Sequence, residues 1–145
     1  MSNRIPPFLR AAVLCQDVEF DGNGIPFKLV EPLHTIRLPR DRFGRPLTEM
    51  FLYAQLEDAN GTFLFSLRVE DENGSVVPQP NLRSVEHTFA GAADERFIPY
   101  ELSIRLFGVV LPAPGVYYFQ LRCDTISLHQ REGAARAPFL RVLSE

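Results

Sequence analysis

The side chains of this chain best suited to bind a metal or to act as bases and nucleophiles are three histidines and two cysteines. His34, His87 and His129 each stand alone in their segments, and Cys15 and Cys123 lie far apart. No His-x-His, His-Glu-x-x-His or Cys-x-x-Cys spacing occurs, so the sequence predicts no local metal site and no cofactor, although folding could still bring two histidines together. Both cysteines fall in alternating apolar segments, where a thiol usually acts as a small buried hydrophobe; a disulfide would need facing strands.

One acidic segment resembles an oxygen-rich calcium loop, with Asp17, Glu19, Asp21 and Asn23 at alternate positions. An EF-hand loop needs glycine at position six and a bidentate glutamate at position twelve. Counting from Asp17, glycine does fall at position six, but position twelve is a lysine, which has the wrong charge. A hairpin turn explains the segment better, and a weak cation site remains the alternative.

Signatures of nucleophilic and phosphate chemistry are missing from the sequence. It contains no Gly-x-Ser-x-Gly and no phosphate-binding glycine loop opening a helix. The neighbouring carboxylates Asp71 and Glu72 fall in a turn, where acids are usually solvated. The arginine-rich segment 37–45 could grip phosphate or an acidic partner, or be a solvated loop stiffened by proline. We therefore assign no catalytic residue and expect no enzyme; a site assembled from distant strands is the remaining enzymatic alternative.

The elements that would position any site are short alternating strands separated by Gly, Pro, Asn or Asp turns. In Thr48–Leu56, for example, Met50, Leu52, Ala54 and Leu56 share one face. The turn Asn60-Gly61 predicts a hairpin between this strand and the next. The remaining strands are expected at Phe8–Phe20, Phe27–Leu38, Phe63–Val69, Ser75–Val77, Leu102–Leu106, Tyr117–Cys123, Ile126–Leu128 and Phe139–Leu143.

This pattern gives about eight or nine strands and almost no helical periodicity in 145 residues, which is the length of one domain spanning 1–145. Half-polar strands can cover only one side of a core. We therefore predict an all-β fold, a two-layer antiparallel β-sandwich, with a small closed barrel as the alternative.

Composition and charge narrow the choice of partners. The chain holds 18 acidic and 15 basic residues, a net charge of −3, which lacks the basic footprint of a nucleic-acid binder. No run approaches the roughly 18 apolar residues of a membrane span. Arg10 interrupts the apolar segment before Cys15, unlike a signal sequence. We expect a cytoplasmic protein that binds neither nucleic acid nor membrane.

The segment Pro114-Gly115-Val116-Tyr117-Tyr118-Phe119 is similar to the Pro-Gly-x-Tyr-x-Phe start of a late strand in many immunoglobulin-like sandwiches. With the acidic turn after Ala12–Gln16, the strand Phe51–Ala54 and Asp71-Glu72-Asn73-Gly74, the chain resembles a family of small bacterial β-sandwich proteins of unknown function. This resemblance implies an immunoglobulin-like sandwich whose tyrosine hydroxyl is hydrogen-bonded to the backbone at the turn. It implies no catalytic residues.

The outward aromatic residues are the strongest functional feature. If Leu52 and its alternate neighbours face the core, Phe51 and Tyr53 point outward, as does Tyr118 on its own strand. Exposed aromatic residues often mark an interface, but a loop such as 78–97 could instead cover them. We predict a non-enzymatic protein–protein interaction or self-assembling module, acting through these residues or a sheet edge. A small-ligand or carbohydrate-binding sandwich, stacking on Phe51, Tyr53 and Tyr118, is the alternative.

Overall fold

A computed structural model describes residues 4–20, 22, 26–47, 50–89 and 100–145. Nearly all regular structure in these residues is strand, with one short 3-10 turn at Arg40–Arg42. No helix in these ranges is long and apolar enough to cross a bilayer. The strands are β1 (Phe8–Phe20), β2 (Pro26–Pro32), β3 (Thr35–Leu38), β4 (Met50–Glu57), β5 (Gly61–Glu70), β6 (Val76–Val77), β7 (Val85–Phe89), β8 (Tyr100–Leu106), β9 (Gly115–Cys123), β10 (Ile126–Ser127) and β11 (Phe139–Ser144).

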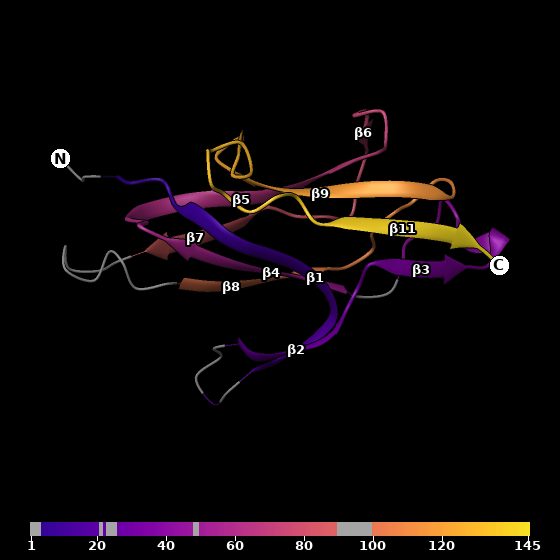
Figure 1. Ribbon diagram of the computed structural model, residues 1–145, viewed down its shortest axis with the longest axis horizontal. Coiled ribbons are helices and arrows are strands. Elements are labelled where there is room, and N and C mark those ends of the chain that lie inside the picture. The colour runs from indigo at the N-terminus through magenta and orange to yellow at the C-terminus, as the bar shows by residue number, and fades with distance from the viewer. Residues whose placement is uncertain (1–3, 21, 23–25, 48–49, 90–99) are drawn as a thin grey trace.

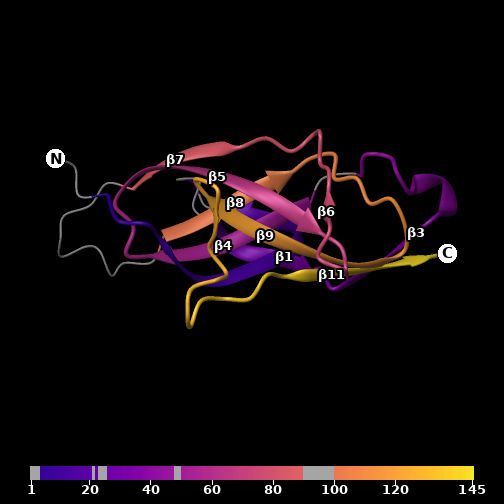
Figure 2. The same cartoon turned by 90° about the horizontal axis from the view of Figure 1, so that it is seen from above.

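The strands form two sheets that lie over one another, as the two views in Figures 1 and 2 show. The first has four strands in the order β2-β1-β4-β8. The second has seven, in the order β3-β11-β9-β5-β6, with β7 also paired to β5 and β10 to β9. All named strand pairs are antiparallel except β3 with β11. The two-layer all-β prediction is confirmed, with 11 strands instead of eight or nine.

Alternation along each strand builds the core between the sheets. The even-numbered residues of β4 from Met50 to Leu56 are buried on one side, and the odd-numbered residues of β9 from Tyr117 to Cys123 are buried on the other. Phe65, Phe89 and Phe119 are among the largest fully buried side chains. The expected inward faces of these strands are confirmed.

The predicted single strand Phe27–Leu38 is wrong, because the chain changes sheets within it. β2 ends at Pro32 and pairs with β1, whereas β3 begins at Thr35 and pairs with β11. Proline has no N–H to donate to a ladder, and Glu31 just before it has φ +48°, a conformation that no regular strand adopts. The proline therefore marks the end of one strand.

The predicted Asn60-Gly61 hairpin is also wrong. β4 is already paired on both edges, with β1 and β8, so β5 cannot pair with it and lies in the other sheet. Asn60 instead exchanges two backbone hydrogen bonds with Ile5, at 2.9 and 3.0 Å. Gly61 has φ +107°, which only glycine tolerates readily, and this lets the chain turn from one layer to the other.

The tyrosine at the start of β9 makes the backbone contact that the resemblance implies. The Tyr117 hydroxyl donates to the Ala113 carbonyl at 2.5 Å and accepts from the Ala113 N–H at 3.2 Å. Tyr117 is only 3% exposed, so the ring fills the core while its hydroxyl fixes the preceding turn. One side chain therefore joins the Pro112–Gly115 connection to the sheet.

We expect Tyr117→Phe to lower the free energy of unfolding by about 1–2 kcal/mol, because both backbone groups of Ala113 lose their partner. Tyr118→Phe is the matched control, since its side chain is exposed on the other face of the same strand. Urea unfolding followed by circular dichroism measures both. Equal stability of the two variants would contradict a structural role for the Tyr117 hydroxyl.

Candidate functional site

The structure does not bring the three predicted interface residues together. Phe51 and Tyr53 lie on the outer face of the four-stranded sheet, opposite Cys15 and Val13 of β1. Tyr118 lies on β9, on the outer face of the other sheet. The core therefore separates Tyr118 from the other two, and no single ligand can stack on all three rings.

Phe51 is covered by the C-terminal half of β1. It is 8% exposed and packs with Cys15 and Val18 in a second, smaller apolar cluster, against which Tyr53 is packed. The β1–β2 hairpin curls beneath the four-stranded sheet, visible below β4 and β8 in Figure 1, and β2 approaches β8. Phe51 thus already has an intramolecular partner.

Of the loop 78–97 that was the expected cover, the described residues 78–89 are not part of the cluster around Phe51. Within that loop, Val85–Phe89 forms β7, which pairs with β5 in the other sheet; residues 90–97 lie outside the described part of the chain. Tyr53 is held differently: its hydroxyl donates to Glu101 Oε1 at 2.8 Å. Burial, helped by the neighbouring Glu101 carboxylate, raises the pKa of Tyr53 to about 12, so the ring stays neutral.

Tyr118, in contrast, is exposed and has an exposed aromatic neighbour. Phe139 of β11 is its direct cross-strand partner, and the two side chains are 40% and 44% exposed. The His34 ring lies 6.4 Å from that of Phe139. Sequence reasoning missed Phe139, although its alternation with buried Leu140 and Val142 would have placed it outward.

Three arginines share the outer face of the sheet with this aromatic pair, and Glu70 is the direct partner of Tyr118 on β5. Arg122 lies on β9, Arg68 on β5 and Arg141 on β11, all at outward positions of the same sheet. We call Tyr118, Phe139, Arg68, Arg122 and Arg141 the aromatic–arginine face.

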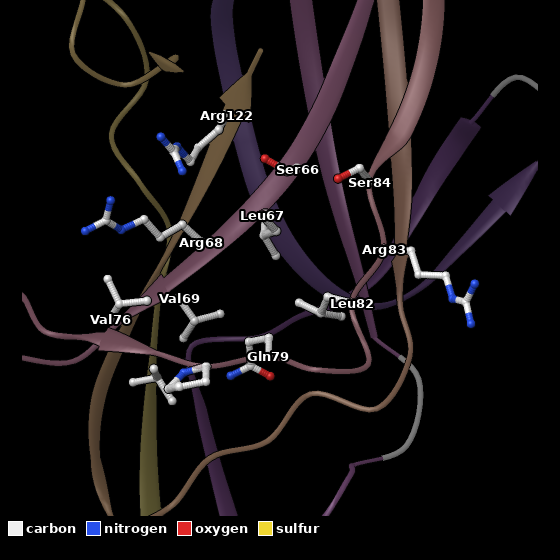
Figure 3. A pocket seen from close by; sticks show the side chains of 12 residues that line it. Ser66, Leu67, Arg68, Val69, Val76, Gln79, Leu82, Arg83, Ser84 and Arg122 are labelled. Carbon is white, nitrogen blue, oxygen red and sulfur yellow. The ribbon is translucent and has the colours of Figure 1, made fainter. Parts of the chain in front are cut away.

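A hollow borders this face along β5 and the β6–β7 connection. Figure 3 shows Arg68 and Arg122 extending to one side from adjacent strands, while Arg83 points away on the other. Arg68 Nε lies 3.0 Å from Glu70 Oε1, and the Arg122 guanidinium donates to the Thr125 carbonyl. The three guanidinium groups do not converge, so the hollow is not a cradle for one anion. It adds positive charge beside the aromatic pair.

A separate apolar cavity of about 430 Å³ lies at the β9–β10 turn. Its apolar wall includes Ile5, Phe63 and Ile126, and Arg4 and Asp124 form an ion pair at its edge. Hydrogen bonds from the Leu64 backbone N–H and from Arg4 lower the pKa of Asp124, so the carboxylate stays charged. This volume and lining suit a small apolar molecule.

The residues considered for metal or nucleophilic chemistry are dispersed. Cys15 and Cys123 are both free and buried, and burial raises the pKa of each thiol, which makes them poor nucleophiles. Among the residues described here, no group of three His, Cys, Asp or Glu side chains could hold a metal ion. Of the acidic segment considered as a calcium loop, Asp21 and Asn23 lie outside those residues. The arginine segment 37–45 begins in β3 and continues through the 3-10 turn at Arg40–Arg42.

No protein-family model matches the chain, and a search of curated proteins gives no match. The resemblance to a bacterial sandwich family therefore remains a prediction.

His129 has a structural position with a measurable pH effect. Its Nε2 accepts from the Leu121 N–H at 3.0 Å, so Nδ1 carries the proton and donates to the Ala135 carbonyl at 2.8 Å. Burial lowers the pKa of His129, and the Ala135 hydrogen bond only partly opposes this. Burial also lowers the pKa of His87.

We expect the free energy of unfolding to fall as pH decreases below the ordinary histidine pKa of about 6.5, because the unfolded chain then binds protons that the folded chain does not. His129→Gln removes one of these protons and should reduce the slope of the unfolding free energy against pH. His87→Gln should remove the rest of the histidine contribution to that slope. Urea midpoints between pH 5 and 8 measure the slope. An unchanged slope in the double variant would refute this account.

Proposed function

We propose that the protein is a non-enzymatic interaction module that binds another protein through its aromatic–arginine face. The observation that carries this is the pair Tyr118 and Phe139, adjacent across β9 and β11 and 40% and 44% exposed. Phe51, the other outward aromatic ring, is buried within the chain itself. The rings of Tyr118 and Phe139 are apolar surface that remains exposed in the folded chain.

The chemistry of this face indicates the chemistry of its partner. Tyr, Phe and Arg are enriched at the centres of protein interfaces, because each provides a large contact area and arginine adds several donors. Arg68, Arg122 and Arg141 favour a partner with carboxylates around an apolar patch. Such an interface would associate faster at low salt and weaken as salt screens the charges.

We also infer that the sandwich is immunoglobulin-like. In support, β1-β4-β8 follow the order of strands A, B and E of such domains, and β5, β9 and β11 follow that of C, F and G. The Tyr117 hydroxyl bonded to the backbone four residues upstream, at the start of the strand in the F position, supports the same assignment. Domains of this architecture often bind partners through sheet faces and edges.

Replacing Tyr118 and Phe139 together by alanine should weaken partner binding by about 30-fold or more, the equivalent of about 2 kcal/mol. The measurement is capture of partners from a native cell extract by immobilised protein, with affinities then determined by interferometry at two salt concentrations. Leu64→Ala is the control, because Leu64 is 46% exposed on the same sheet but lies six residues along β5 from Glu70, the residue that pairs with Tyr118. Capture of the same proteins by wild type and double variant would contradict the proposal.

The cavity at the β9–β10 turn favours a second candidate function, binding of a small apolar molecule. Its wall is largely apolar, with the Arg4–Asp124 pair available to orient a polar end. The turn itself is strained: Asp124 and Thr125 have φ of +51° and +88°, and the latter is unusual for a β-branched residue. Such strain often occurs where a turn serves a binding site.

We expect the neutral apolar fluorophore N-phenyl-1-naphthylamine to bind saturably, and Ile126→Asp to weaken that binding about tenfold, because an apolar ligand would desolvate the new charge. Ile126→Leu is the matched control. Ile126 is 66% exposed, so neither change should unfold the protein. Absence of saturable fluorescence with wild-type protein would eliminate this candidate.

A further inference from the structure

We infer that β8 is a self-pairing edge through which two copies of this chain join their four-stranded sheets. This inference deepens the proposed function by naming a second copy as one partner of the module, and it rests on that proposal only to this extent. It concerns the sheet opposite the aromatic–arginine face, so the two can be tested separately.

β8 is an open edge among the strands that the structure describes. It pairs with β4 over all seven residues from Tyr100 to Leu106 without a bulge, and no described strand pairs with its other side. The other sheet edges are short or protected. β2 begins and ends with proline and its pairing with β1 contains an irregularity, β3 has four residues before Pro39, β6 has two residues before Pro78, and β7 has five.

Apart from the charged Glu101 and Arg105, β8 lacks the usual devices that prevent edge pairing. Its sequence contains no proline, glycine or lysine, and its inward residues Leu102, Ile104 and Leu106 are all buried apolar side chains. Straight apolar edges of this length are the ones that attract another strand. An apolar groove of about 210 Å³, whose lining includes Ile104 and Leu106, runs beside β8, with Val85 and Phe107 40% and 63% exposed along it.

The sequence of β8 is complementary to itself when two copies run antiparallel. With the two-fold axis at Ser103, Glu101 of one copy lies opposite Arg105 of the other, and the reverse pair forms on the other side of the axis. Both residues are exposed and lie on the same face of the sheet. Each also has a contact within its own chain, Glu101 with the Tyr53 hydroxyl and Arg105 with the Phe107 ring, and keeps exposed surface beyond it. Leu102 then meets Ile104, which continues the apolar layer. Opposite charges and apolar pairs at directly facing positions stabilise antiparallel strands.

Ser103, at the centre of this arrangement, adds an independent observation. Its hydroxyl is buried and has no hydrogen-bond partner within the described residues. A buried hydroxyl without a partner is costly. In the two-fold pairing the two Ser103 residues lie directly opposite one another, so a change of rotamer that uncovers each hydroxyl would give it the other as a partner.

The experiment uses charge reversal and sedimentation velocity over a range of protein concentrations. Wild-type protein should form a concentration-dependent dimer. Arg105→Glu and Glu101→Arg should each weaken dimerisation about tenfold or more, because both facing pairs become like-charged. Mixing the two single variants should restore dimers that contain one of each, and the double variant Glu101→Arg/Arg105→Glu should dimerise with itself.

Rescue by mixing cannot arise from unfolding of either variant, so it tests the pairing itself. The inference is overturned if wild-type protein stays monomeric at all concentrations, if either single variant dimerises as well as wild type, or if mixing restores nothing. A monomer that instead binds an added β-strand peptide of foreign sequence would also overturn it, in favour of another occupant. Tyr118→Ala/Phe139→Ala should leave the dimer intact, so failure here is distinguishable from failure of the proposed function.

Discussion

The apolar contact between the inner faces of the two sheets is the interaction on which the rest of this structure depends. The core joins the buried residues of β4 and β8 to those of β5, β9 and β11. Because every central strand buries its apolar face in this contact, only its other face can contact solvent, a loop or a partner. The same packing separates the two outer surfaces, so that Phe51 and Tyr118 have different surroundings.

Local alternation allowed much of this fold to be predicted from the sequence. A strand reveals its inward residues within seven or eight positions, so the alternation predicts β5, β8 and β9 with their buried faces nearly as they are, and β1 with its observed bounds. Strand pairing is not local, and the pairing predicted from the sequence was wrong for β4. The turn at Asn60-Gly61 has the composition of a hairpin, yet the neighbours of β4 come from the start of the chain and from β8. β7 has a weak alternation, so the sequence predicts a loop there.

The candidate site was harder to predict because exposure is decided by elements distant in the sequence. Phe51 and Tyr118 have the same outward pattern in their strands, but only Phe51 meets the curled end of β1. The outward position of Phe139 follows from its alternation with the apolar residues Leu140 and Val142. The arginines around it come from three strands, and nothing in their spacing along the chain shows that they share one surface.

The placement of β11 has a consequence for how the protein is made. The last strand of the chain is not at an edge: it lies between β3 and β9 and is the only partner that β3 has among the described strands. On the ribosome, residues 35–38 must therefore wait for residues 139–144, and a nascent chain carries two unjoined strand edges until residues 139–144 have been synthesised. Long-range closure of this kind is slow. Loss of residues 139–144 would leave β3 without a partner strand among those described.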